Sequence, residues 1–402
     1  MSIRRTSLAV ACVLTGCASQ LHHGVSSPAR DPHRPASGAV SAWPAAIHDA
    51  THSGTSRVDG PTTGHVRWTR DLGANVTPGP VVGADGTIYA ATNSGVLHAL
   101  DPATGADRWT FDGGGAYGVD LSTSPAVLDD GTILWPGSSS TLFALSPAGR
   151  LEWSEPFVGE VLSPAVASDN VVYVMTTDAT LTRLDVSKGA HRRRWTIGLG
   201  TTSYGSPAIA PDGTVVTSVD NDLVTVLDQG DHGAVKWRYD TGDVVEVSPA
   251  IASDGTVVIG TNGRTEIALR PDGTVRWTYP RNSQSYSSAA ITPDGVAWFG
   301  DHHGYLNGVR VRDGHLVRRV QGMGRRPRGP SSIGVWTSPA IDHDGNVYFG
   351  TRPGHIYGFA SNGRRLFDIN AHATIDSYPA IAGDGTLLIG ATNGTLYAIQ
   401  ST

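Results

Sequence analysis

The sequence predicts an all-β fold, an eight-bladed β-propeller in which each blade is a four-stranded sheet. Three observations predict it. A short apolar segment that ends in an Asp-Gly or Asp-Asn turn recurs eight times along the 402-residue chain, at a spacing of about forty residues. The chain has 50 glycines, 24 prolines and only 16% charged residues, and no long apolar stripe at helical spacing. The last repeat also lacks its fourth strand, whereas a fourth-strand signature stands alone before the first repeat.

The first two strands of each blade are expected to form a tight hairpin. The first strand has the pattern Pro-Ala-Ile or a close variant, such as Pro80-Val81-Val82, and the second is rich in β-branched residues, as in Thr256-Val257-Val258-Ile259. Asp-Gly between two such runs favours a tight hairpin because both residues accept positive φ. The eight turns are Asp85-Gly86, Asp130-Gly131, Asp169-Asn170, Asp212-Gly213, Asp254-Gly255, Asp294-Gly295, Asp344-Gly345 and Asp384-Gly385.

The third and fourth strands carry a second repeated feature. A third run, such as Val96-Leu97-His98-Ala99-Leu100, is followed by a Gly that stands four residues before an aromatic residue, as in Gly105 and Trp109. A large ring at one fixed place in the fourth strand can pack against the next blade, which gives each repeat the same inter-blade contact. The sixth repeat departs from the pattern because Arg318 stands where the ring is expected.

The two ends of the chain are predicted to meet in one blade. The last repeat stops at Thr402 after three strands, and Trp68 marks the isolated fourth-strand signature. Trp68 precedes Pro80 by twelve positions, which is also the spacing in four later repeats: Trp195 to Pro207, Trp237 to Pro249, Trp277 to Ala289 and Phe367 to Pro379. We therefore predict that residues 65–69 pair with the C-terminal blade and close the ring. Closure removes the two sheet edges that an open array would expose.

The first residues resemble a bacterial export signal. Arg4 and Arg5 precede an apolar run over 8–14 that is too short to span a bilayer, and Leu14-Thr15-Gly16-Cys17 is similar to a lipobox, in which the Cys is lipidated. We expect a signal peptide at 1–16, lipidation at Cys17 and attachment to the cell envelope on its periplasmic or extracellular side. An ordinary signal peptide with an incidental Cys is the alternative.

The mature chain is predicted to have a tether and one folded domain. Residues 17–59, rich in Ala, Ser, Pro, His and Gly, are expected to be a disordered tether and lead-in, and residues 60–402 the propeller. Cleavage before Cys17 removes Cys12, so Cys-based disulfides, metal sites and nucleophiles are excluded. Loss of two arginines changes the formal charge from −6 to −8, which argues against a nucleic-acid partner. We expect a monomer.

Binding groups are expected on one face of the ring. The Asp-Gly turns and the third-to-fourth turns are uniform and share one face, whereas the connections on the opposite face differ from blade to blade. Variation on a rigid frame is typical of binding sites. The predicted rim of this variable face consists of Tyr117, Asp120, Glu160, Tyr204, Glu246, Tyr286, Trp336, His372 and Asp376. A polar channel mouth that binds nothing is the alternative.

Two connections of the variable face have unusual composition. Asp301-His302-His303-Gly304 could contribute to a metal or proton-transfer site, although adjacent side chains in an extended turn point apart, and a solvated turn is the alternative. The longest connection contains Arg325, Arg326 and Arg328, which could bind an anionic glycan, a phosphate group or an acidic partner; its alternative is a solvated loop. No carboxylate cluster or Cys motif predicts a resident metal.

The repeat resembles the pyrroloquinoline-quinone (PQQ)-like propeller family. The family's docking motif, Ala-x-Asp-x-x-Thr-Gly with Trp four residues after the Gly, is complete once, from Ala99 to Trp109, and the resemblance covers about residues 60–402. Trp43-Pro44 through His52-Ser53-Gly54 is similar to the lead-in that precedes such rings.

Two branches of this family imply different functions. The quinone-dependent dehydrogenases are typically longer, and many carry an adjacent Cys pair and a calcium site. This chain has neither that pair nor a haem motif. The resemblance therefore implies the BamB-like lipoprotein branch: a non-enzymatic, lipid-anchored scaffold that binds an envelope protein or polymer. No cofactor is expected; the fold permits PQQ, but the sequence does not support it. The alternative is a polysaccharide-active enzyme or quinone oxidoreductase that uses acid/base groups on the variable face, which are Glu160, Glu246, His302, His303 and Asp376.

Overall fold

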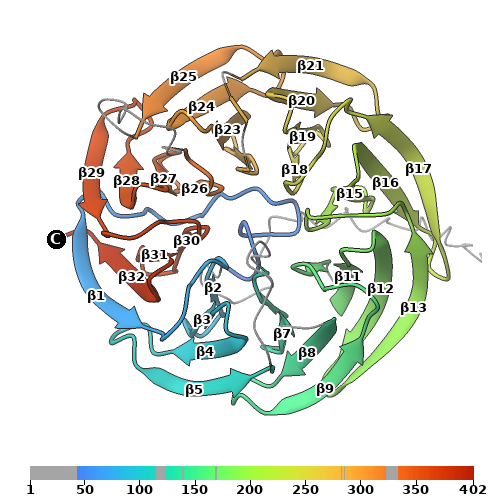
Figure 1. Ribbon diagram of the computed structural model, residues 1–402, viewed down its shortest axis with the longest axis horizontal. Coiled ribbons are helices and arrows are strands. Elements are labelled where there is room, and N and C mark those ends of the chain that lie inside the picture. The colour runs from blue at the N-terminus through green and yellow to red at the C-terminus, as the bar shows by residue number, and fades with distance from the viewer. Residues whose placement is uncertain are drawn as a thin grey trace, which may run out of the picture. The chain divides into compact units, whose positions relative to one another are not determined.

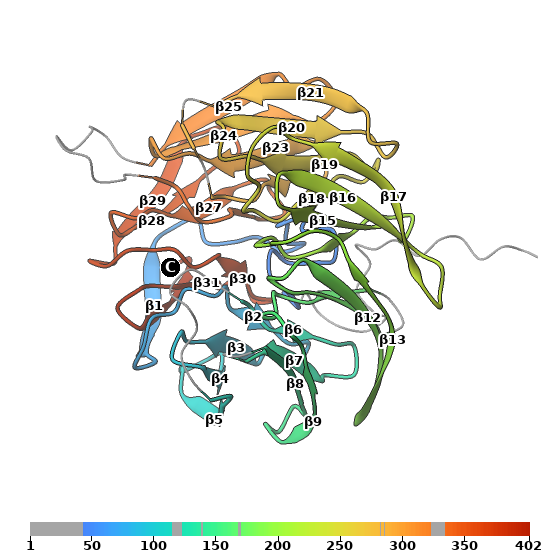
Figure 2. The ribbon, with the colours of Figure 1, turned by 45° about the vertical axis from the view of Figure 1, so that its right-hand side comes forward.

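The computed structural model describes residues 43–114, 123–137, 140–167, 170–281, 283–284, 286–322 and 334–402. Within these ranges the chain forms eight antiparallel four-stranded sheets arranged as the blades of a ring, so the predicted fold class is confirmed (Figure 1). The strands of each blade follow one another from the centre of the ring to its outer edge (Figure 1 and Figure 2). No helix in the described ranges is long and apolar enough to cross a membrane.

The blades have the following strands. Blade 1 contains β2 (Val81–Val82), β3 (Ile88–Ala91), β4 (Val96–Leu100) and β5 (Asp107–Asp112). Blade 2 contains β6 (Ala126–Val127), β7 (Ile133–Pro136), β8 (Thr141–Leu145) and β9 (Leu151–Pro156). Blade 3 contains β10 (Ala165–Val166), β11 (Val171–Met175), β12 (Thr180–Ser187) and β13 (Ala190–Gly198). Blade 4 contains β14 (Ala208–Ile209), β15 (Val215–Val219), β16 (Asp222–Asp228) and β17 (Gly233–Asp240).

The second half of the ring repeats this order. Blade 5 contains β18 (Ala250–Ile251), β19 (Val257–Gly260), β20 (Thr265–Leu269) and β21 (Val275–Pro280). Blade 6 contains β22 (Ala290–Ile291), β23 (Val296–Gly300), β24 (Tyr305–Arg310) and β25 (Leu316–Gln321). Blade 7 contains β26 (Ala340–Ile341), β27 (Val347–Gly350), β28 (His355–Phe359) and β29 (Arg365–Asn370). Blade 8 contains β30 (Ala380–Ile381), β31 (Leu387–Gly390), β32 (Thr395–Gln400) and β1 (His65–Asp71).

The N-terminal strand completes the last blade. β1 pairs antiparallel with β32, from His65 opposite Gln400 to Asp71 opposite Thr395, and supplies the outer strand of the sheet (Figure 1). The indole Nε1 of Trp68 donates to the carbonyl oxygen of Pro102 in blade 1 at 3.1 Å, which joins blade 8 to its neighbour. The predicted closure is therefore confirmed, and β32 has a partner on both sides.

Fourth-strand rings contact the next blade as predicted, and one glycine shows why the motif needs Gly. The Trp109 ring packs on Gly149 of blade 2, where an added Cβ would lie 2.5 Å from the indole and φ is +77°. Trp109 Nε1 also donates to Pro147 O at 2.9 Å. A side chain at Gly149 would therefore both clash and strain the backbone. In the sixth repeat, Arg318 replaces the ring and donates instead to the carbonyl oxygen of Asn362.

The lead-in lies inside the ring, which corrects part of the domain prediction. Backbone N–H groups of six innermost strands donate to carbonyl oxygens between Trp43 and Gly54; the donors are Val82, Val127, Ile209, Ile251, Ile291 and Ile341, at 2.6–2.9 Å. Residues 43–59 therefore belong to the folded unit, and a disordered segment reaching residue 59 is wrong for this part. The predicted signal peptide, Cys17 and the tether up to residue 42 lie outside the described residues.

Candidate functional site

The antiparallel order of each blade separates two faces. The Asp-Gly hairpins and the third-to-fourth turns lie at one end of the strands, and the second-to-third and fourth-to-first connections lie at the other. The second end is the variable face of the prediction. Tyr204, Glu246, Tyr286, Trp336 and Asp376 occupy the same place in blades 4 to 8, three residues before the Pro or Ala that opens the first strand.

Four predicted residues of blades 6 to 8 come together around one tryptophan. The rings of His302 and Trp336 stack with centroids 5.0 Å apart, and the Tyr286 ring meets Trp336 edge-on at 4.8 Å. The guanidinium carbon of Arg352 lies 3.8 Å from the Trp336 ring centroid, and Arg352 Nε lies 3.6 Å from Asp376 Oδ1. We call these five residues the aromatic cluster. Sequence reasoning missed Arg352, because a single Arg after a strand carries no spacing signal.

Burial perturbs the titratable groups of the aromatic cluster. It lowers the pKa of His302, against the raising effect of the nearby Asp301 carboxylate. It raises the pKa of Asp376, which Arg352 opposes. His302 Nε2, Trp336 Nε1 and Asp376 Oδ1 are buried and have no hydrogen-bond partner among the described residues. The cluster therefore presents a donor, an imidazole nitrogen and a carboxylate oxygen that a bound group or water could satisfy.

Asp301 has a structural role next to this cluster. Its side chain is fully buried, and its carboxylate accepts hydrogen bonds from the backbone N–H groups of His303 and Tyr305 at 2.9 and 3.0 Å. These bonds shape the turn between β23 and β24. No group of three or more His, Cys, Asp or Glu side chains in the described ranges is arranged to hold a metal ion. His303 follows His302 in this turn, and the rings that contact one another are those of His302, Tyr286 and Trp336.

The connections of blades 3 to 5 form a different surface. Val158, Tyr204 and Val244 lie in three successive fourth-to-first connections, and their exposed fractions are 92%, 48% and 39%. We call these three residues the apolar arc. Glu160 is exposed beside it, and Glu246 accepts a hydrogen bond from Asn262 Nδ2 at 2.9 Å. Sequence reasoning found Tyr204 and the two glutamates but missed both valines, because an isolated exposed Val does not disturb a β pattern.

The remaining predicted residues are not part of either group. His372 is exposed in the connection before blade 8, where its backbone N–H donates to Asn370 Oδ1 at 2.9 Å. Five others lie outside the described residues, and so their predicted roles stay predictions: Tyr117, Asp120, Arg325, Arg326 and Arg328.

A buried charge pair marks blade 5 at the same end of its strands. Glu266 and Arg281 are both 0% exposed, and Glu266 Oε2 lies 3.6 Å from Arg281 Nη1. Burial raises the pKa of Glu266 to about 7, although Arg281 opposes the shift. The other seven blades have Leu or Ile at the place of Glu266, namely Leu97, Leu142, Leu181, Leu223, Leu306, Ile356 and Leu396.

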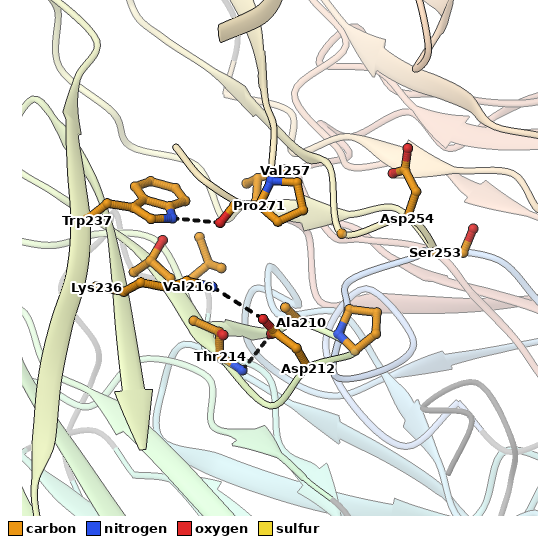
Figure 3. A pocket seen from close by; sticks show the side chains of 13 residues that line it. Ala210, Asp212, Thr214, Val216, Lys236, Trp237, Ser253, Asp254, Val257 and Pro271 are labelled. Carbon is orange, nitrogen blue, oxygen red and sulfur yellow. Dashed lines mark hydrogen bonds and ion pairs between the residues drawn. The ribbon is translucent and has the colours of Figure 1, made fainter. Parts of the chain in front are cut away.

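Two pockets open on the Asp-Gly face, opposite to where the sequence placed the binding groups. One, of about 320 Å³, lies between blades 4 and 5 (Figure 3). The other, of about 290 Å³, lies between the lead-in and blades 5 and 6, and is lined by residues that include His48, Arg57 and His343. Sequence reasoning missed both pockets. The Asp-Gly turns have nearly the same sequence in every blade, which hides the differences between the side chains that pack around them.

A family model described as "Outer membrane protein assembly factor BamB" matches residues 55–121, 114–196 and 191–402. The chain belongs to this family. BamB of Moranella endobia (strain PCIT) is 23% identical over 267 residues, which cover 62% of this chain and 65% of that protein. BamB of Yersinia pestis is 24% identical over 267 residues, which cover 52% of this chain and 64% of that protein. The matched region thus spans less than two thirds of either relative.

Solved structures share the fold of this BamB-family chain. The crystal structure of BamB from Moraxella catarrhalis superposes with a TM-score of 0.63 at 16% identity, covering 84% of this chain and all of that one. Quinohemoprotein alcohol dehydrogenase from Comamonas testosteroni gives a TM-score of 0.70 at 12% identity, covering 89% and 80%. Both a BamB and a dehydrogenase are therefore similar in fold, and at such identities the fold alone does not separate their functions.

Proposed function

We propose that this BamB-family protein is a lipid-anchored, non-catalytic scaffold of the bacterial cell envelope that binds a protein partner through the variable face. The single observation that carries the proposal is the apolar arc, Val158, Tyr204 and Val244, exposed in three consecutive connections. The relatives that match along the ring are named outer membrane protein assembly factors, which supports an envelope protein as the partner.

The chemistry of the arc favours a protein partner. Exposed apolar side chains that gather on neighbouring elements mark interaction sites, and Tyr is enriched in interfaces because its ring is apolar and its hydroxyl can hydrogen-bond. Glu160 and Glu246 flank the three residues. A partner strand or loop with apolar side chains and neighbouring Lys or Arg would complement this surface. The protein would act as a monomer held to the membrane through Cys17.

The titratable groups named for the enzyme alternative are divided between two surfaces. Glu160 and Glu246 lie on connections before blades 3 and 5, whereas His302 and Asp376 belong to the aromatic cluster of blades 6 to 8. Catalytic acids and bases act together in one pocket, so this separation supports a scaffold. We propose that no quinone is bound. A specific quinone absorption band after PQQ is added to the purified protein would contradict this.

Capture of partners from native envelope tests the scaffold proposal. The arc variant carries Val158→Asp, Tyr204→Asp and Val244→Asp. Its matched control carries Val235→Asp, Val275→Asp and Leu316→Asp, which change residues of similar exposure (44%, 38% and 43%) on the outer strands β17, β21 and β25. We expect wild type and control to retain one envelope assembly protein, and the arc variant to lose it by about tenfold or more. Equal recovery with both variants would contradict the proposal.

A further inference from the structure

The pocket between blades 4 and 5 has mixed walls. It is lined by the turn around Asp212, by Val216 of β15, Thr225 of β16 and Trp237 of β17, and by the blade 5 turn around Asp254 (Figure 3). Its volume of about 320 Å³ lies at the lower end of the range for small-molecule sites. It therefore has room for one small ring and not for a large cofactor.

The pocket is a local departure from the repeat. In four other blades the place of Val216 holds an aromatic residue, namely Tyr89, Tyr173, Trp298 or Tyr348. The Tyr89 ring lies 5.8 Å from Trp109, the fourth-strand ring of its own blade. Val216 is too small to reach Trp237 in the same way. Blade 5 also has a Val, at 258, but its ring Trp277 is only 7% exposed, so the space is closed there.

A buried hydroxyl in the pocket lacks a partner. Thr225 is 2% exposed, and its Oγ1 has no hydrogen-bond partner among the described residues. In all the described blades except blades 3 and 4 the same place holds Ala or Gly, so a polar group here is not required by the fold. Buried polar groups are normally satisfied by protein, water or ligand. Thr225 therefore offers a hydrogen bond to an occupant of the pocket.

The charges at the rim compensate one another. Lys236 Nζ lies 3.4 Å from Asp212 Oδ2, and Arg276 Nη1 lies 2.5 Å from Asp254 Oδ2. Each carboxylate thus has a cation of its own, and the rim does not favour a charged ligand. Both carboxylates remain half-exposed and can still accept hydrogen bonds from hydroxyl groups.

We propose that this pocket binds one ring of a neutral sugar. Such a ring has apolar C–H faces, which suit Val216, Val257 and the Trp237 indole, and an edge of hydroxyls, which suits Thr225 and the rim carboxylates. The site goes beyond the proposed scaffold function, because it lies on the Asp-Gly face and not on the face that carries the apolar arc. Partner binding and sugar binding can therefore fail independently.

Saturation-transfer NMR on the full folded protein tests this site. The probes are glucose and N-acetylglucosamine at about 10 mM, with glucuronate as a charged comparator. Wild type is expected to transfer saturation to at least one neutral sugar and less to glucuronate. Val216→Tyr installs the residue that three other blades carry at this place, and should weaken binding by about tenfold or more by filling the pocket.

A pair of isosteric substitutions keeps the test valid if Val216→Tyr perturbs folding. Thr225→Val removes the hydroxyl in the pocket and should weaken binding by about fivefold. Thr217→Val removes an equally buried, unpartnered hydroxyl of the same blade that does not line the pocket, and should leave binding unchanged. The proposal is overturned if neither neutral sugar binds, if glucuronate binds more tightly, or if Thr225→Val and Thr217→Val behave alike.

Discussion

Replacing Glu266 by glutamine should stabilise the protein at alkaline pH and leave its stability unchanged in acid. Glu266 is fully buried, and neither of its carboxylate oxygens has a hydrogen-bond partner among the described residues. Burial raises its pKa from 4.5 to about 7 in the folded protein, even though Arg281 lies nearby. Glutamine has the same shape and cannot ionise, so it keeps the neutral form at every pH.

The magnitude follows from the pKa shift. Between pH 4.5 and 7 the folded protein binds one more proton than the unfolded chain, so stability falls as the pH rises through this window. Each pKa unit corresponds to 1.36 kcal/mol, so the loss is about 3 kcal/mol. This contribution is fully present below pH 4.5 and absent above pH 7. Glu266→Gln should therefore exceed wild type by about 3 kcal/mol near pH 8 and equal it near pH 4.

The ion pair is too weak to reverse this sign. The closest approach between the Glu266 carboxylate and the Arg281 guanidinium is 3.6 Å, which is longer than a hydrogen bond. Arg281 has other partners, because its Nη2 donates to the carbonyl oxygens of Thr261 and Thr265 and the buried Asp301 also raises its pKa. The pKa of Glu266 is raised even with Arg281 beside it, so the cost of burying the carboxylate outweighs its attraction to the guanidinium.

Urea unfolding across this pH range measures the effect, because the free energy of unfolding extrapolates linearly to zero denaturant. Glu160→Gln is the matched control, since Glu160 is exposed on the same face, and it should change stability by less than about 0.5 kcal/mol at any pH. The reasoning is refuted if Glu266→Gln is less stable than wild type near pH 8, because the ion pair would then outweigh desolvation.

Three further predictions concern closure and the lead-in. Trp68→Ala should lower the free energy of unfolding in urea by about 3 kcal/mol, because Trp68 links β1 to blade 1. Its control, Arg67→Ala, loses only an exposed ion pair with Asp384 and should cost under about 1 kcal/mol, and equal costs would contradict closure through β1. Gly54→Ala should lower the melting temperature more than Gly73→Ala. Both glycines have positive φ, but only at Gly54 would the new Cβ clash, because it would lie 2.5 Å from the Ala290 Cβ. A larger effect at Gly73 would be inconsistent with a packed lead-in. Burial lowers the pKa of His52 below 6.5, so the stability contributed by the neutral imidazole is present above that pH and lost on acidification. Wild type should therefore lose more stability than His52→Gln between about pH 7.5 and 5.5. Parallel curves of stability against pH would contradict this prediction.

The sequence predicted the ring because the ring is periodic. The eight hairpin turns, the Gly-to-ring spacing and the twelve residues from Trp68 to Pro80 each report on a contact that recurs from blade to blade. The lead-in has no repeated contact of this kind. Its hydrogen bonds use backbone carbonyls between Trp43 and Gly54, and backbone groups leave no side-chain pattern, so a disordered segment was predicted up to residue 59.

The candidate site was only partly predictable for a related reason. Position in the repeat identified Tyr286, Trp336 and Asp376 as neighbours of the channel mouth, and the structure brings them together with His302. Arg352 joins them through a contact between blades that no spacing encodes. Two exceptions to the repeat can be seen in the sequence. Glu266 stands in a column of Leu and Ile, and Val216 stands where four blades have an aromatic ring.

A photo-cross-linking amino acid in place of Tyr204 tests the central claim most directly, because Tyr204 is the middle residue of the apolar arc. The same amino acid in place of Val235 is the control, since Val235 has a similar exposure of 44% on the outer strand β17. In native envelope, we expect one specific adduct with an outer-membrane assembly protein at the first position and none at the second. The absence of an adduct at Tyr204, or the same adducts at both positions, would contradict partner binding through this face.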